Sequence, residues 1–136
     1  MKMFLLSVCL LAAACAPIQN APPPEHSSID AVRFSVERVS ATTVRLMLDN
    51  GAEHRIGYNL CHSALERRAG DTWTQAGTSD VCTMDLRILN PGHDATLEKQ
   101  LPATLPAGEY RYVTSIESPL GTTQNGITSD TFRIPG

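Results

Sequence analysis

The sequence predicts an all-β domain, an antiparallel sandwich of seven to eight strands that follows an N-terminal signal segment. Apolar residues recur at every second position in short runs, and turn residues separate these runs at intervals of about ten residues. No amphipathic helical pattern follows residue 28. Because alternation buries one face of each strand, two antiparallel sheets must pack face to face. A small closed barrel is the alternative.

Composition agrees with this fold class and excludes one class of partner. The 136 residues suffice for a single domain of ordinary size. Charged residues make up 18%, aromatic residues 5%, and Gly and Pro number 9 each, which suits a turn-rich β domain. The formal charge of −3 comes from scattered residues and forms no positive stripe. We therefore expect no nucleic-acid partner.

Residues 1–14 have the pattern of a secretory signal. Lys2 precedes an apolar run from Met3 to Leu11, and three alanines then lead to Cys15. The run is shorter than the ~20 residues that a membrane-spanning helix requires.

Leu11-Ala12-Ala13-Ala14-Cys15 resembles the lipobox of bacterial lipoproteins. This resemblance implies that Cys15 receives a diacylglyceryl group and becomes the first residue of the mature chain, carrying fatty-acyl chains such as palmitate. The lipobox prefers Leu where this sequence has Ala12. The alternative is ordinary cleavage near Ala14 or Ala16, which would leave an unpaired thiol on a secreted protein.

The resemblance also implies a location. Two or more acyl chains anchor a protein stably to a membrane. Ala16 stands where an Asp would signal retention at the inner membrane, so we expect anchoring at the outer membrane, with the domain in the periplasm or at the cell surface. Residues 15–28 include the run Pro22-Pro23-Pro24 and form a Pro-rich tether, a spacer of ~40 Å at most at ~3.1 Å per residue.

The folded domain is expected to span residues 29–136. Its alternating runs predict eight strands in order, at 32–36, 44–48, 56–60, 64–68, 72–76, 95–101, 109–117 and 127–134. Predicted turns separate several of them, at Asp49-Asn50-Gly51, Ala69-Gly70-Asp71 and Asn90-Pro91-Gly92. The fourth and fifth strands form a hairpin that carries Trp73, the one tryptophan.

The segment Leu105-Pro106-Ala107-Gly108-Glu109-Tyr110-Arg111-Tyr112-Val113 resembles the turn and strand shared by fibronectin type III and bacterial immunoglobulin-like domains. The resemblance covers roughly residues 30–135. It implies an immunoglobulin-like sandwich in which Tyr110 forms a tyrosine corner, its hydroxyl bonding to upstream backbone. The sequence departs from true immunoglobulin domains because Cys82 precedes the Tyr110 strand and does not lie within it.

Two cysteines remain for the folded domain, because Cys9 leaves with the signal and Cys15 is the lipidation site. A disulfide between Cys61 and Cys82 is the default in an oxidising compartment. A loop of about 22 residues closed in this way stabilises by about 3 kcal/mol in the chain-entropy model.

A metal site is the alternative for these cysteines that would give them a chemical function. Cys61, His62, Cys82 and His54 offer thiolate and imidazole groups, but their spacing matches no zinc pattern. A Cys61–His62 nucleophilic dyad is weaker, since a disulfide would abolish it. We expect no catalytic residue, no cofactor and no metal.

The sequence therefore predicts a lipid-anchored, non-enzymatic module of the cell envelope that binds an envelope protein partner or has a structural role. The loop at 77–88 is the expected contact region, because it is long and the disulfide would hold it. The alternative function is inhibition of a protease or a cell-wall hydrolase, in which a braced loop occupies an active-site cleft. Small bacterial proteinase inhibitors of this sandwich type share the same turn pattern.

Overall fold

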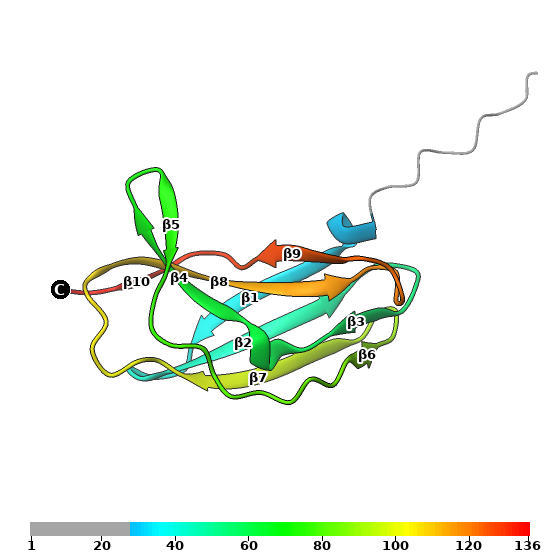
Figure 1. The fold of residues 1–136 in the computed structure, drawn as a ribbon, viewed down its shortest axis with the longest axis horizontal. Coiled ribbons are helices and arrows are strands. Elements are labelled where there is room, and N and C mark those ends of the chain that lie inside the picture. The colour runs from blue at the N-terminus through cyan, green and yellow to red at the C-terminus, as the bar shows by residue number, and fades with distance from the viewer. Residues whose placement is uncertain (1–27) are drawn as a thin grey trace, which may run out of the picture.

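The computed structural model describes residues 28–136, which form a two-layered β-sandwich (Figure 1). The predicted signal segment 1–14, the predicted lipidation site Cys15 and nearly all of the predicted tether lie outside these residues. Helical structure in the described part is limited to two 3-10 turns, η1 (Ser28–Ala31) and η2 (Leu60–His62). Among residues 28–136 no helix is long and apolar enough to cross a membrane.

The smaller sheet has three antiparallel strands in the order β1-β2-β7. Their bounds are Val32–Arg38 for β1, Thr43–Asn50 for β2 and Asp94–Gln100 for β7. Burial alternates along β2, so that Val44, Leu46 and Leu48 are fully buried while the residues between them lie on the outer face.

The larger sheet is built around one unbroken strand, β8. Its seven segments are β3 (Ile56–Tyr58), β4 (Ala64–Ala69), β5 (Thr72–Gln75), β6 (Arg87–Leu89), β8 (Gly108–Glu117), β9 (Gln124–Thr128) and β10 (Phe132–Ile134). β3 and β4 pair in succession with one edge of β8, and β9 and β10 pair in succession with the other. β6 and β5 then pair with the outer edges of β3 and β4. The sheet therefore has four columns, three of which are interrupted.

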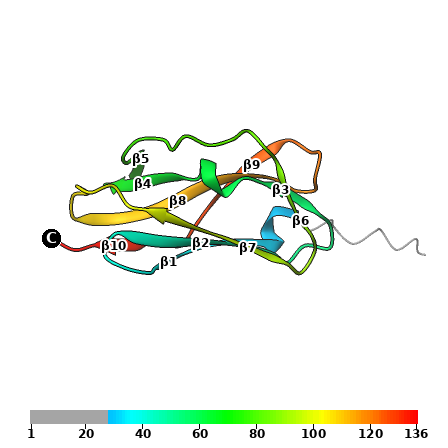
Figure 2. The same ribbon diagram turned by 90° about the horizontal axis from the view of Figure 1, so that it is seen from below.

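The core lies between the two sheets, which Figure 2 shows edge-on as two layers. Leu46 and Leu48 from β2 meet Ile56, Tyr110 and Ile116 from the larger sheet, all fully buried. Three strands facing four columns, with β8 central, form an immunoglobulin-like sandwich. The predicted fold class is confirmed, and the alternative closed barrel is wrong because the two sheets do not join into one.

The number of strands differs from the prediction, with ten short segments in place of seven to eight. The third predicted strand ends at Tyr58, because Leu60 turns into η2 and is buried there. The last predicted strand is interrupted after Thr128 and starts earlier, at Gln124. β6 was not predicted.

A further difference concerns Asn50, which was predicted in a turn and instead ends β2, fully buried. Its side-chain Nδ2 donates to the carbonyls of His54 and Leu89, at 2.9 and 3.1 Å. Its Oδ1 accepts from the backbone N–H of Ala52 at 3.1 Å. A buried amide that is satisfied in this way links the end of β2 to the loop at His54 and to Leu89 of the larger sheet.

Tyr110 joins its strand to the turn that precedes it. Its ring is fully buried, and its hydroxyl donates to the carbonyl of Pro106, four residues upstream, at 2.5 Å. The residue expected to form the tyrosine corner thus bonds to upstream backbone.

We expect Tyr110→Phe to lower the free energy of unfolding by about 1–2 kcal/mol, because the Pro106 carbonyl loses its partner while the ring packing is kept. Urea denaturation of the full chain measures the change. Tyr112→Phe is the matched control: the Tyr112 hydroxyl makes no hydrogen bond with residues 28–136, and we expect stability close to that of the unmodified protein. Equal losses in the two variants would contradict a stabilising role for the Tyr110 hydroxyl.

Candidate interaction surface

The short turn η2 and the residue before it, Asn59, lie between β3 and β4 at the side of the sandwich. Asn59 caps η2, and its Oδ1 accepts from the backbone N–H of Cys61 at 3.1 Å. Leu60 is buried, and its carbonyl accepts from the N–H of Ser63. The tight turn anchored by Leu60 leaves Cys61 partly buried and His62 exposed.

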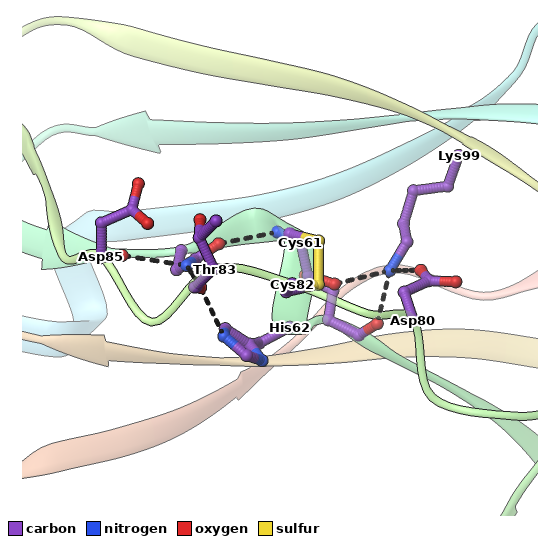
Figure 3. Close-up of a disulfide and its surroundings, with 9 residues drawn as sticks. Cys61, His62, Asp80, Cys82, Thr83, Asp85 and Lys99 are labelled. Carbon is purple, nitrogen blue, oxygen red and sulfur yellow. Dashed lines mark hydrogen bonds and ion pairs between the residues drawn. A yellow bond between two sulfur atoms is a disulfide. The ribbon is translucent and has the colours of Figure 1, made fainter.

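Residues 77–86, here called the strap, join β5 to β6 along the length of the sandwich (Figure 1). They contain neither helix nor strand, and residues 78–86 contain no turn or bend. The predicted disulfide is confirmed: Cys82 of the strap is bonded to Cys61 of η2, with 5.8 Å between their Cα atoms (Figure 3). The disulfide holds the middle of the strap against the break between β3 and β4.

Side chains on either side of the disulfide hold the strap through its main chain (Figure 3). The Nδ2 of Asn59 donates to the carbonyls of Thr83 and Asp85, both at 2.9 Å. The Nε2 of His62 donates to the carbonyl of Thr83 at 3.0 Å, and since a carbonyl only accepts, the proton lies on that nitrogen. Asn59 therefore caps η2 with one end of its amide and fixes the strap with the other.

Lys99 connects the two sheets beneath the strap. It occupies an inward-facing position of β7, and its side chain is only 9% exposed. The ammonium donates to the carbonyls of Cys61 and Ser63, both at 2.9 Å, and lies 2.6 Å from Oδ2 of Asp80 at the start of the strap (Figure 3). A charge this deeply buried is stable only because all three donor positions have acceptors.

The ring of Tyr112 lies below this ammonium, with 5.9 Å between Nζ of Lys99 and the ring centroid. Burial, together with the nearby carboxylate of Asp80, raises the pKa of Tyr112 to about 12. The phenol therefore stays neutral at physiological pH, and the ion pair of Lys99 with Asp80 is the charged contact in this region.

Exposed apolar side chains gather on and beside the strap. Five large hydrophobic residues of the described chain are exposed, and four of them are Val81 (103%), Met84 (89%), Leu86 (43%) and Ile88 (52%). Met84 and Leu86 line one groove, whereas Val81 lines another beside Leu97. Several exposed apolar side chains on one segment mark an interaction surface more often than single scattered ones do. Because the strap is held at Asp80, Cys82, Thr83 and Asp85, these side chains extend from a fixed backbone.

A groove of about 590 Å³ separates the strap from the outer face of the larger sheet. Met84 and Leu86 line one wall, and Ala64 and Val113 lie on the sheet side. Glu117 also lines the groove, and its Oε2 accepts from the N–H of Gly121 at 2.9 Å. The lining of the groove thus combines apolar side chains with polar residues, including Asp85 of the strap.

The other predicted site residues do not converge on a chemical centre. The alternative metal site and the Cys61–His62 dyad are both wrong, because both thiols are consumed by the disulfide. His54 lies elsewhere, its Nε2 3.2 Å from Oγ of Ser118. In the described part of the chain no three His, Cys, Asp or Glu side chains form a group that could hold a metal ion.

Sequence reasoning missed Asn59 and Lys99, which fix the candidate surface. One feature of the sequence pointed to Lys99: it follows Ala95 and Leu97 at alternate positions, so the alternation places it on the inward face of the strand. No such feature pointed to Asn59, since its role depends on strap carbonyls more than twenty residues away.

Fold and surface together define a small immunoglobulin-like sandwich with a disulfide-held strap along one side. No protein-family model matches the chain, and the search of curated proteins returned no match. Among solved structures, it is similar to the archaellum periplasmic stator protein FlaG from Sulfolobus acidocaldarius, with 20% identity and a TM-score of 0.45. That match covers 76% of this chain and 97% of FlaG. A chain of the FlaF and FlaG stator complex from the same organism is similar over 92% of this chain and 100% of its own, with 18% identity and a TM-score of 0.43.

Proposed function

We propose that this protein is a lipid-anchored, non-catalytic binding module of the bacterial cell envelope. The lipid on Cys15 holds it at the outer membrane, residues 15–28 space the domain from the lipid surface, and the strap contacts a protein partner. The observation that carries the binding role is the group of four exposed apolar side chains on and beside a segment fixed by a disulfide.

Two features support the envelope location. The segment from Leu11 to Cys15 has the lipobox pattern, and the residues before it have the pattern of a secretory signal. The Cys61–Cys82 disulfide fits an oxidising compartment, where such bonds form and persist.

The geometry of the strap favours binding over the alternative of enzyme inhibition. An inhibitor that fills an active-site cleft needs a loop that protrudes from its scaffold. The strap is instead held to the sandwich at the Asp80 side chain, at Cys82, and at the carbonyls of Thr83 and Asp85. It therefore lies along the sandwich and does not protrude from it as an inhibitory loop would.

We expect Cys15→Ser to move the protein from the membrane fraction to the soluble fraction, or to leave it unprocessed, because the anchor would be lost. Mass spectrometry of the N-terminal peptide from the unmodified protein checks the same point and should show an acylated Cys15. Cys9→Ser is the matched control and should leave fractionation unchanged. An unacylated residue 15 in the mature protein would contradict the anchor.

The binding role is tested by a photo-cross-linking amino acid placed at Met84 of the full chain in intact cells. Met47, on the outer face of β2, is the matched control position. We expect a discrete adduct from position 84 and none from position 47. Equal labelling from both positions, or no adduct from position 84, would contradict the strap as the contact surface.

A further inference from the structure

β6 and the strap form an outer edge of the larger sheet. β6 pairs with β3 on one side, and none of the strand pairings among residues 28–136 uses its other side. An open strand edge presents unpaired N–H and C=O groups and is a template for another strand. This edge continues into the strap, which reaches β6 without a turn or bend after residue 77.

The main-chain groups of the strap alternate in direction. The carbonyls of Thr83 and Asp85 face inward and are both occupied by Asn59. In an extended chain the N–H and C=O groups of successive residues point to opposite sides. Those of Met84 and Leu86 therefore face outward, and neither residue makes a main-chain hydrogen bond with any part of the chain that the structure describes.

The same alternation continues through β6. The N–H of Leu120 donates to the carbonyl of Arg55, the residue just before β3, which places that carbonyl on the side of β3 that faces β8. Tyr58 lies three residues later, so its main-chain groups point to the opposite side, where Tyr58 pairs with Arg87 of β6. Ile88, the next residue along β6, consequently directs its main chain outward. Residues 84, 86 and 88 thus share one free edge.

Their side chains also share one face. Met84 and Leu86 line the groove on the outer face of the sheet, beside Val113. Ile88 is paired with Gly57, where an added Cβ would lie 3.0 Å from the methyl carbons of Leu86. The exposed edge therefore has an apolar row at alternate positions.

Opposite charges lie between these apolar residues. Asp85 and Arg87 are both exposed, and neither takes part in an ion pair with residues 28–136. A hydrogen bond from the side chain of Thr83 lowers the pKa of Asp85, so its carboxyl is anionic at neutral pH. The sequence from 84 to 88 consequently reads apolar, negative, apolar, positive, apolar.

When a second copy of residues 84–88 is placed antiparallel to the first, each apolar residue faces an apolar residue and each charge faces the opposite charge. We infer that the edge pairs antiparallel with the same edge of a second copy of this chain, about a twofold axis at Leu86. Leu86 then faces Leu86 of the other copy, Met84 faces Ile88, and Asp85 faces Arg87. The apolar pairs are the positions whose main chains face outward and can exchange hydrogen bonds, and the charged pairs lie between them. Such a contact uses the same patch on both copies, as a twofold dimer requires.

The inference rests on the proposed function, because it names the partner of the strap. Its register is tested by cysteine cross-linking of the full, lipidated chain. Directly opposed residues of a hydrogen-bonded antiparallel pair have Cα atoms about 5.5 Å apart, within the range of a disulfide. We expect Leu86→Cys to give a covalent dimer in the periplasm, whereas Val39→Cys, which is exposed elsewhere, should not.

Two further variants make the test specific for register. Met84→Cys alone and Ile88→Cys alone should give no covalent dimer, because in each case the new cysteine faces an apolar residue. Two differently tagged chains, one with Met84→Cys and one with Ile88→Cys, should cross-link when they are expressed together. Absence of both the Leu86→Cys dimer and the mixed dimer would overturn the inference.

The charged pairs give an independent test. Asp85→Arg alone and Arg87→Asp alone each place like charges opposite one another twice in the dimer. We expect each to weaken dimerisation about tenfold in sedimentation equilibrium of the full chain in detergent, and the double variant to restore it. Single variants that dimerise as tightly as the unmodified chain would overturn the register.

Photo-cross-linking from Met84 separates this inference from the proposed function. An adduct with a second copy supports both. An adduct only with a different envelope protein overturns the dimer and leaves the proposed function intact, whereas no adduct overturns both.

Discussion

Lys99→Met should lower the free energy of unfolding by about 2–4 kcal/mol, the larger of the two main effects that we expect. Methionine has a similar volume but no donor, so the carbonyls of Cys61 and Ser63 lose their partner in a buried region. Unsatisfied buried acceptors cost about 1–3 kcal/mol each, reduced where water can reach them. Urea or thermal denaturation of the full chain measures the loss.

Asp80→Asn is the matched control for Lys99. The Asp80 side chain is 53% exposed, so the solvent screens its ion pair with the ammonium, and the two carbonyl contacts of Lys99 are kept. We expect this variant to lose less than about 1 kcal/mol. A loss as large as that of Lys99→Met would show that the ion pair, and not the carbonyl contacts, dominates. A Lys99→Met variant as stable as the original protein would contradict the role of Lys99 altogether.

Loss of the Cys61–Cys82 disulfide should cost about 3 kcal/mol, because the unfolded chain regains the freedom that the cross-link removes. The double variant Cys61→Ser/Cys82→Ser leaves no cysteine among residues 28–136 and is the cleaner test, and Cys61→Ser alone should also lower thermal stability. Melting temperatures measured with and without reductant check the same contribution in the unmodified protein. Equal melting temperatures would contradict it.

The part of the molecule that loses stability when the disulfide is removed is a second readout. Amide hydrogen exchange in the serine double variant should speed up across the strap, residues 77–86, because the covalent bond is lost. Two hydrogen bonds from Asn59, one from His62 and the ion pair of Asp80 with Lys99 then remain as the main contacts there. Exchange in β2 and β8, whose inward residues form the core, should change little in native conditions. Uniform acceleration through both sheets would contradict local release of the strap.

The sequence predicted the fold where burial has a period of two. Val44, Leu46 and Leu48 are fully buried in one strand, as alternation required, and the hairpin at 64–76 turns at Gly70 with φ of 64°, as the turn residues indicated. The disulfide was predicted because only two cysteines remained for the domain. These features depend on local pattern or on composition, which one sequence contains in full.

The features that escaped prediction depend on contacts between distant segments. β6 has three residues, too few for a periodic signal, and forms because β3 offers a free edge. Asn50 was assigned to a turn by its residue type, but carbonyls at 54 and 89 satisfy its amide and allow its burial. Lys99 was not singled out, because its three acceptors, in η2, at Ser63 and in the strap, converge only in the folded chain.

The most direct test of the strap as the interaction surface is oxidative footprinting of methionine in intact cells. In the isolated chain at high dilution, Met84 should oxidise faster than Met47, because it is 89% exposed whereas Met47 is partly buried on β2. In intact cells we expect Met84 to be protected while Met47 oxidises as before. Equal oxidation of Met84 in intact cells and in the dilute isolated chain would contradict the strap as a surface that another protein covers.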